Sequence, residues 1–152
     1  MYKRQHFYVQ VTDYLSEVTK ALIHITRPAF GHIDNNHEGL SKEQIVDLMR
    51  VNDQVEAIFD KINDMLRTKD FSDLDMVLEM RDKLFDTIVE AIKNQLRRIN
   101  GDPAASTRAS VLYLTILNET KTMILQARNL LKSQRYFLDH KGQTTDWLSL
   151  TK

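Results

Sequence analysis

Residues 53–86, DQVEAIFDKINDMLRTKDFSDLDMVLEMRDKLFD, decide the fold of this chain. Two helix-periodic arms flank a short break at residues 68–70, which predicts two antiparallel helices folded back on each other about Asp70. Helix-spaced acids occur on both arms: Glu56, Asp60, Asp82 and Asp86. Residues equally far from the turn of such a hairpin lie at the same level, because both helices rise equally per residue. We therefore expect these four carboxylates in one layer.

Outward from this hairpin, the remaining sequence also has helical periodicity. Ser41 and Gln44 form a capping box that should begin the first arm. Asn100-Gly101 should end the second arm, because this pair is a common helix stop. We expect four helices, at about residues 7–26, 41–67, 72–100 and 106–137.

The first of these helices should bury one face and either end at Pro28 or kink there and continue for a further turn toward Ile33. The residues expected on that face are Val11, Tyr14, Leu15, Val18, Ala21, Leu22 and Ile25. The second helix has a similar stripe, made of Ile45, Leu48, Val55, Phe59, Ile62 and Leu66.

Length and composition agree with an all-α protein. The 152 residues suit a single domain, and only four Gly and two Pro favour long helices over strands and turns. Short connections make an antiparallel up-and-down bundle of four long helices the expected architecture. We expect an ordered core over about residues 7–137 and a tail over 138–152, in which Trp147 is either loose or folded onto the bundle.

Several classes of function are disfavoured by the sequence. There is no Cys, which excludes disulfides and thiolate metal sites, and the zero net charge predicts no nucleic-acid partner. No apolar run approaches the length of a membrane span. The sequence also lacks a glycine-rich phosphate loop and an assignable nucleophile-and-base set. We therefore expect a soluble, non-enzymatic chain.

The acidic layer is the candidate metal site. Asp82 lies among apolar positions at helical spacing, and a buried carboxylate needs a metal or a basic partner such as Arg81 or Lys83. Folding the other helices in the same way adds weaker candidates at this level: Glu17, His24 and Glu119. Carboxylates and imidazole suit Mn, Fe, Zn or Mg. The alternative is an ordinary solvated set of ion pairs. His32, Asp34 and His37 form a second, weaker candidate in a loop.

The last helix has a polar but nearly uncharged side opposite its apolar side. The residues on it that we expect to bind a partner are Asn118, Thr122, Gln126 and Asn129. Such a side is either solvated or docks on another chain, including a second copy in a dimer.

Residues 52–60, NDQVEAIFD, resemble the Asn-Asp-x-x-Glu-x-Ile-x-Asp signature of PhoU-like helical domains. Residues 81–86, RDKLFD, are similar to the partner helix of that family, and weaker likeness extends from about Val9 to Phe137. The resemblance implies a PhoU-like bundle in which Glu56 and Asp60 belong to the metal motif. It is greatest to the C-terminal domain of sodium-coupled or Pit-type bacterial phosphate transporters.

This resemblance implies a cytoplasmic accessory domain, excised from a larger membrane transporter and lying at the inner membrane. Its basic start, Tyr2-Lys3-Arg4, would follow the last span, as the positive-inside rule favours. Its expected role is regulatory, through contacts with its own transmembrane portion, with or without a bound metal. The alternative is a free-standing metal-binding or structural four-helix bundle.

Overall fold

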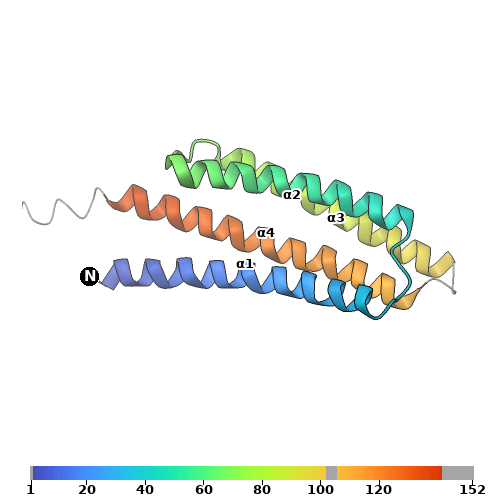
Figure 1. Ribbon diagram of the computed structural model, residues 1–152. Helices are drawn as coiled ribbons and strands as arrows, with labels where there is room; N and C mark the ends of the chain where they lie inside the picture. The colour runs from blue at the N-terminus through green and yellow to red at the C-terminus, as the bar shows by residue number, and fades with distance from the viewer. Residues whose placement is uncertain (1, 102–105, 142–152) are drawn as a thin grey trace, which may run out of the picture.

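The computed structural model describes residues 2–101 and 106–141, and it is all-α over these residues. It consists of four helices: α1 (Tyr2–Asp34), α2 (Lys42–Thr68), α3 (Leu74–Gly101) and α4 (Thr107–Lys141). The chain runs up and down between successive helices (Figure 1). The prediction of four long helices with short connections is confirmed, while Trp147 lies outside the described residues.

Local sequence signals set several helix ends. The Ser41 hydroxyl accepts a hydrogen bond from the Gln44 backbone N–H, and the Gln44 side chain accepts one from Ser41 N, so the predicted capping box is present. Lys69 ends α2 in the left-handed conformation, with φ of 60°. Helix α1 continues through Pro28 to Asp34, so of the outcomes expected at Pro28 the helix end is not observed and the further turn toward Ile33 is. Packing along α4 offsets the local cost of this proline, which is about 3 kcal/mol.

Helix α4 is the centre of the fold. It lies between α1 on one side and the α2–α3 hairpin on the other (Figure 1). Within the described helices, α1 packs on α4 alone, and no Cα atom of α1 comes within 8 Å of α2 or α3. A square bundle, in which each helix contacts two neighbours, is therefore not formed.

The core lies between α2, α3 and α4. Its fully buried side chains include Ile58 of α2, Leu84 and Ile88 of α3, and Tyr113 and Leu117 of α4. Helix α1 buries Ala21 and adds the half-buried Val18 to the edge of this core. The molecule is thus a three-helix core with a fourth helix laid along the outside of α4.

Candidate interaction surface

The cross-helix contacts of the α2–α3 hairpin are nearly symmetric about Asp70, as the sequence predicts. Gln54 Nε2 donates to Thr87 Oγ1 at 3.1 Å, and Gln44 Nε2 donates to Gln95 Oε1 at 3.1 Å. Each pair straddles Asp70 almost evenly along the chain. The acids of the expected layer therefore lie at corresponding levels of the two helices.

These acids lie on outward faces instead of meeting in the hairpin. Glu56, Asp60, Asp82 and Asp86 are all exposed. Glu56 accepts a hydrogen bond from Asn52 Nδ2 at 3.1 Å on its own helix. The apolar residues that join the hairpin, such as Ile58 and Leu84, occupy the faces between the helices and turn the acids to solvent.

Asp82 is held by a base and not by the core. Its side chain is 64% exposed and lies 2.6 Å from Arg81 Nη2, so the expectation that it is drawn into the apolar stripe is wrong. Arg81 is the more buried partner, at 17% exposure, and its guanidinium lies over the ring of Phe85. The basic partner anticipated for Asp82 is therefore the one present.

The weaker ligand candidates form two separate pairs. Glu17 pairs with Lys20 at 2.6 Å on α1, while His24 Nδ1 lies 3.4 Å from Glu119 Oε2 of α4. In residues 2–101 and 106–141, no three His, Asp or Glu side chains are grouped so that they could hold a metal ion. Within this part of the chain, the expected layer is thus not assembled into one metal site.

The polar side of α4 is only partly available to a partner. Asn118 and Thr122 are exposed, and they bond to carbonyls of their own helix, those of Leu114 and Asn118 respectively. Gln126 and Asn129 are half-buried. Because α4 lies between α1 and the hairpin, much of its circumference is already covered.

An apolar groove runs between α1 and α2, with α4 as its floor. Leu22 and Ile25 form the α1 wall, Met49 belongs to the α2 wall, and Ile116 and Met123 lie on the floor. The groove encloses about 490 Å³, and Asn52 and Asp53 also line it. An apolar floor beside polar side chains is the usual anatomy of a protein-binding surface.

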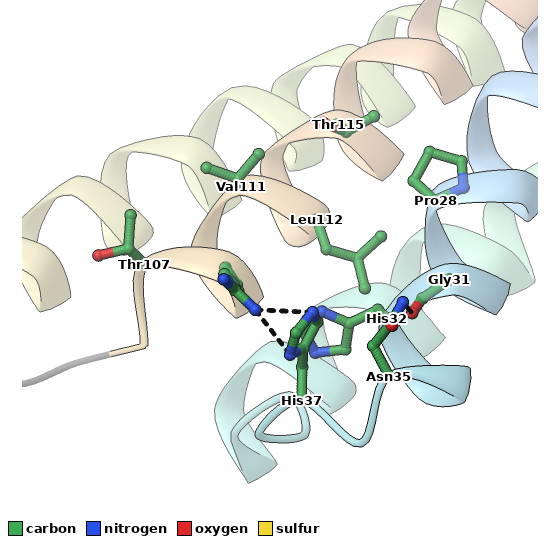
Figure 2. A pocket seen from close by; sticks show the side chains of 10 residues that line it. Pro28, Gly31, His32, Asn35, His37, Thr107, Val111, Leu112 and Thr115 are labelled. Carbon is green, nitrogen blue, oxygen red and sulfur yellow. Dashed lines mark hydrogen bonds between the residues drawn. The ribbon is translucent and has the colours of Figure 1, made fainter.

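A second, smaller hollow of about 350 Å³ is lined by His32, in the last turn of α1, and by His37, in the α1–α2 loop (Figure 2). His32 Nε2 donates to the Glu38 carbonyl oxygen at 2.7 Å, which fixes that nitrogen as protonated. Both ring nitrogens of His37 lie near Arg108 Nη1, at 3.0 and 2.9 Å. Desolvation, reinforced by the Arg108 charge, lowers the pKa of His37. These side chains fasten the α1–α2 loop to the start of α4.

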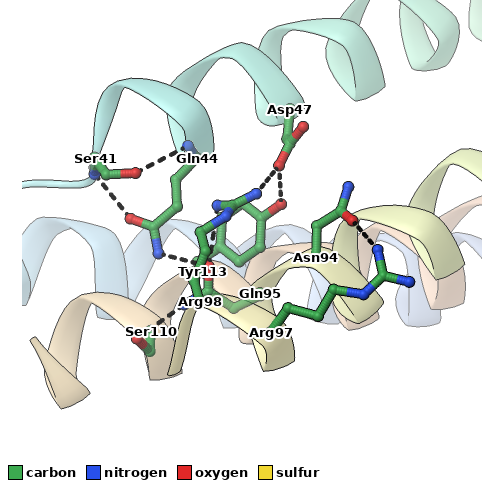
Figure 3. A network of polar contacts seen from close by, with 9 residues as sticks. All are labelled: Ser41, Gln44, Asp47, Asn94, Gln95, Arg97, Arg98, Ser110 and Tyr113. Carbon is green, nitrogen blue, oxygen red and sulfur yellow. Dashed lines mark hydrogen bonds and ion pairs between the residues drawn. The ribbon is translucent and has the colours of Figure 1, made fainter. Parts of the chain in front are cut away.

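A buried polar network joins the three core helices at the same end (Figure 3). The Gln95 side chain accepts hydrogen bonds from Gln44 and Arg98 and donates one to Ser110 Oγ at 3.0 Å. Asp47 accepts from both Arg98 and Tyr113, at 2.5 and 2.8 Å. Burial, followed by the Asp47 hydrogen bond, raises the pKa of Tyr113. The network is internally paired, which suits a structural role.

Sequence reasoning missed both this network and the groove. The sequence predicts Gln44 as a capping residue, but its buried hydrogen bond to Gln95 spans 51 residues of sequence and no local pattern indicates it. The groove arises because α1 does not contact α2 along its length. This separation depends on how whole helices pack and not on a local sequence pattern.

The fold and the groove define a helical module with a polar-edged apolar surface. No family model, curated protein or solved structure matches the chain. No helix among the described residues is both long enough and apolar enough to span a bilayer.

Proposed function

We propose that this chain is an accessory domain of an inorganic phosphate transporter, at the cytoplasmic face of the inner membrane. It acts as a binding module and not as an enzyme, and it regulates uptake through contacts with its own transmembrane portion. The observation that carries the proposal is the outer face of α2, where the polar residues of the PhoU-like signature are exposed next to the apolar groove.

The distribution of buried and exposed residues along α2 supports this proposal. Val51 and Ile58 are buried in the core, which accounts for the apolar positions of this stretch. Asn52, Asp53 and Glu56 are exposed, and core packing gives no reason for their presence. Asn52 and Asp53 line the groove beside Met49, so an incoming segment would meet apolar contacts and hydrogen-bonding groups together.

The test uses the reading frame that encodes this chain. We expect it to encode apolar membrane spans upstream, and we expect deletion of residues 2–141 to change phosphate uptake by cells that depend on this protein. Labelled phosphate uptake measures the effect. A reading frame that encodes no membrane span, together with unchanged phosphate uptake after the deletion, would refute the proposal and leave a free-standing bundle.

A paired substitution tests the surface itself. Asp53→Arg with Glu56→Arg reverses the charge beside the groove, and it should change uptake while leaving the melting temperature of the isolated domain unchanged, because both side chains are exposed. Glu79→Arg, at an exposed acid of α3, is the matched control and should leave uptake as in the wild type. If Glu79→Arg changes phosphate uptake as much as the paired substitution does, the groove has no specific role.

A further inference from the structure

The hollow at the start of α4 brings together three side chains that can carry positive charge. They are His32 in the last turn of α1, His37 in the α1–α2 loop and Arg108 in the first turn of α4. The two imidazole rings have centroids 5.3 Å apart, and Arg108 Nη1 lies 3.0 and 2.9 Å from the ring nitrogens of His37 (Figure 2). We call these three residues the basic cluster. Like charges gathered so closely repel one another unless an anion lies among them.

The described part of the chain supplies no such anion. Asp34 and Glu38 are the acids next to the cluster in sequence, but no acidic side chain is among the described residues that line the hollow. The ion pairs found in residues 2–101 and 106–141 do not include Arg108. Desolvation lowers the pKa of His37, and the charges that add to this effect, those of Arg108 and His32, are cationic. Within these ranges the basic cluster therefore has no counter-charge.

The hydrogen bonds that hold the cluster leave donors free. His32 is 9% exposed, and its ring is fixed by the bond from Nε2 to the Glu38 carbonyl oxygen at 2.7 Å. Arg108 contacts His37 through Nη1, and no acceptor in the described chain uses its Nε or Nη2. These two nitrogens form one edge of the guanidinium, which is the edge that binds two oxygens of a phosphate or carboxylate at once.

The hollow has room for a small ligand beside the cluster. Its volume of about 350 Å³ falls at the lower end of the range of about 300–1,000 Å³ that is typical of small-molecule sites. Gly31 lines it, and a Cβ atom added to this glycine would meet no other atom within 4 Å. Val111 and Leu112 give it an apolar wall. The site thus offers cationic donors, open space and an apolar side for whatever group a bound anion carries.

We propose that this hollow binds a phosphate group, with Arg108 as the main contact and the two histidines as further donors. Phosphate suits the basic cluster better than a carboxylate does, because it brings up to two negative charges and at least three acceptor oxygens. Free phosphate compounds and lipid headgroups share this chemistry. The hollow shares no lining residue with the groove, so this site is independent of the transporter assignment.

An NMR titration with inorganic phosphate at constant ionic strength tests the proposal. The resonances of the basic cluster should shift and saturate, with a dissociation constant below about 5 mM. Phosphate should also raise the pKa of His37, because a nearby anion stabilises the imidazolium. Arg108→Gln should weaken binding about tenfold or more, since a charge-assisted contact is lost. Arg135→Gln removes the same charge from an exposed position on the same helix and should bind like the wild type. Shifts that do not saturate, or equal weakening in both variants, would overturn the proposal.

Filling the hollow gives a second test that leaves the basic cluster intact. Gly31→Leu should fold at least as stably as the wild type, because leucine favours a helix more than glycine does, but it should lose phosphate binding. Gly101→Leu is the matched control, because Gly101 is also helical, has open space around an added Cβ and does not line the hollow. It should bind phosphate like the wild type. Undiminished binding by a folded Gly31→Leu would refute this location.

Sedimentation with phosphatidylcholine vesicles, with and without phosphatidic acid, distinguishes the two sources of the phosphate group. Binding to the phosphatidic acid vesicles alone, competed by soluble phosphate and lost in Arg108→Gln, would support a lipid headgroup in this site. Saturable binding of soluble phosphate without vesicle binding would support a free phosphate compound. Vesicle binding that persists in Arg108→Gln and is not competed by phosphate would refute the lipid headgroup as the ligand of this site.

Discussion

Replacing Gln95 with leucine should destabilise the protein, because this side chain is the centre of the buried polar network. Gln95 is 2% exposed and has three partners, Gln44, Arg98 and Ser110. Leucine has a similar size and leaves little cavity. The cost therefore comes from the polar groups that lose a partner.

Two of those three groups keep another partner. Arg98 retains Asp47, and the Ser110 hydroxyl still donates to the Ser106 carbonyl at 2.9 Å. Gln44 Nε2 loses the acceptor that the network supplies, and a buried donor without an acceptor costs about 1–3 kcal/mol. For a chain of this size, that corresponds to a fall in melting temperature of roughly 2–12 °C.

Urea unfolding followed by circular dichroism measures the change in free energy of unfolding. Lys93→Leu, an exposed position on the same helix, is the control and should stay within about 0.5 kcal/mol of the wild type. Adding Gln44→Leu to Gln95→Leu removes the stranded donor, so the double variant should lose less stability than the two single losses added together. If Gln95→Leu is as stable as Lys93→Leu, the reasoning is refuted.

Two further predictions concern charged side chains on the surface. Because desolvation and the Arg108 charge lower the pKa of His37, Arg108→Gln should raise that pKa towards 6.5 in an NMR titration. A lowered pKa makes the folded protein lose stability as the pH falls below 6.5, so the variant should lose less stability on acidification than the wild type. An unchanged pKa would show that Arg108 has no influence on His37. Because Asp82 is an exposed partner of Arg81 and the nearby acids are dispersed, Asp82→Asn should cost no more than about 1 kcal/mol. Mn, Fe or Zn should raise the melting temperature of neither form, and a metal-dependent rise lost in Asp82→Asn would instead restore the acidic layer as a metal site.

The four helices and several of their ends, though not the ends of α1, could be predicted from sequence because the signals are local. The Ser41–Gln44 capping box and the stop at Asn100-Gly101 depend on residues within one or two turns. The level of the hairpin pairs could also be predicted, since equal rise on either side of Asp70 brings Gln54 to Thr87.

The direction in which each helix faces could be predicted only in part. On α4 the apolar side, opposite the polar residues, is buried, for example at Ile124 and Leu131, because α4 has neighbours on both sides. On α1 the predicted buried positions Leu15 and Leu22 are exposed, and on α2 Ile45 is exposed. Periodicity identifies an apolar face, but it does not say how much of that face a neighbouring helix covers.

The candidate site could be predicted least well. The sequence places the four acids at related levels of the hairpin. Whether they point outward depends on which faces of α2 and α3 are buried in the core. The pairing of Asp82 with its neighbour Arg81 is local and was one of the two alternatives. The groove and the Gln95 network require residues from different helices, and no spacing within one helix predicts them.

The packing of the first helix on the last has a consequence for how the chain is made. Phe7 near the start of α1 stacks on Phe137 near the end of α4, with ring centroids 4.1 Å apart. During synthesis, α1 leaves the ribosome before the other three helices and cannot pack on α4 until residues 107–141 have been made, whereas the α2–α3 hairpin can form from neighbouring segments. Until α4 has been made, the apolar side chains of α1, including Leu15 and Leu22, are therefore a surface that chaperones can hold.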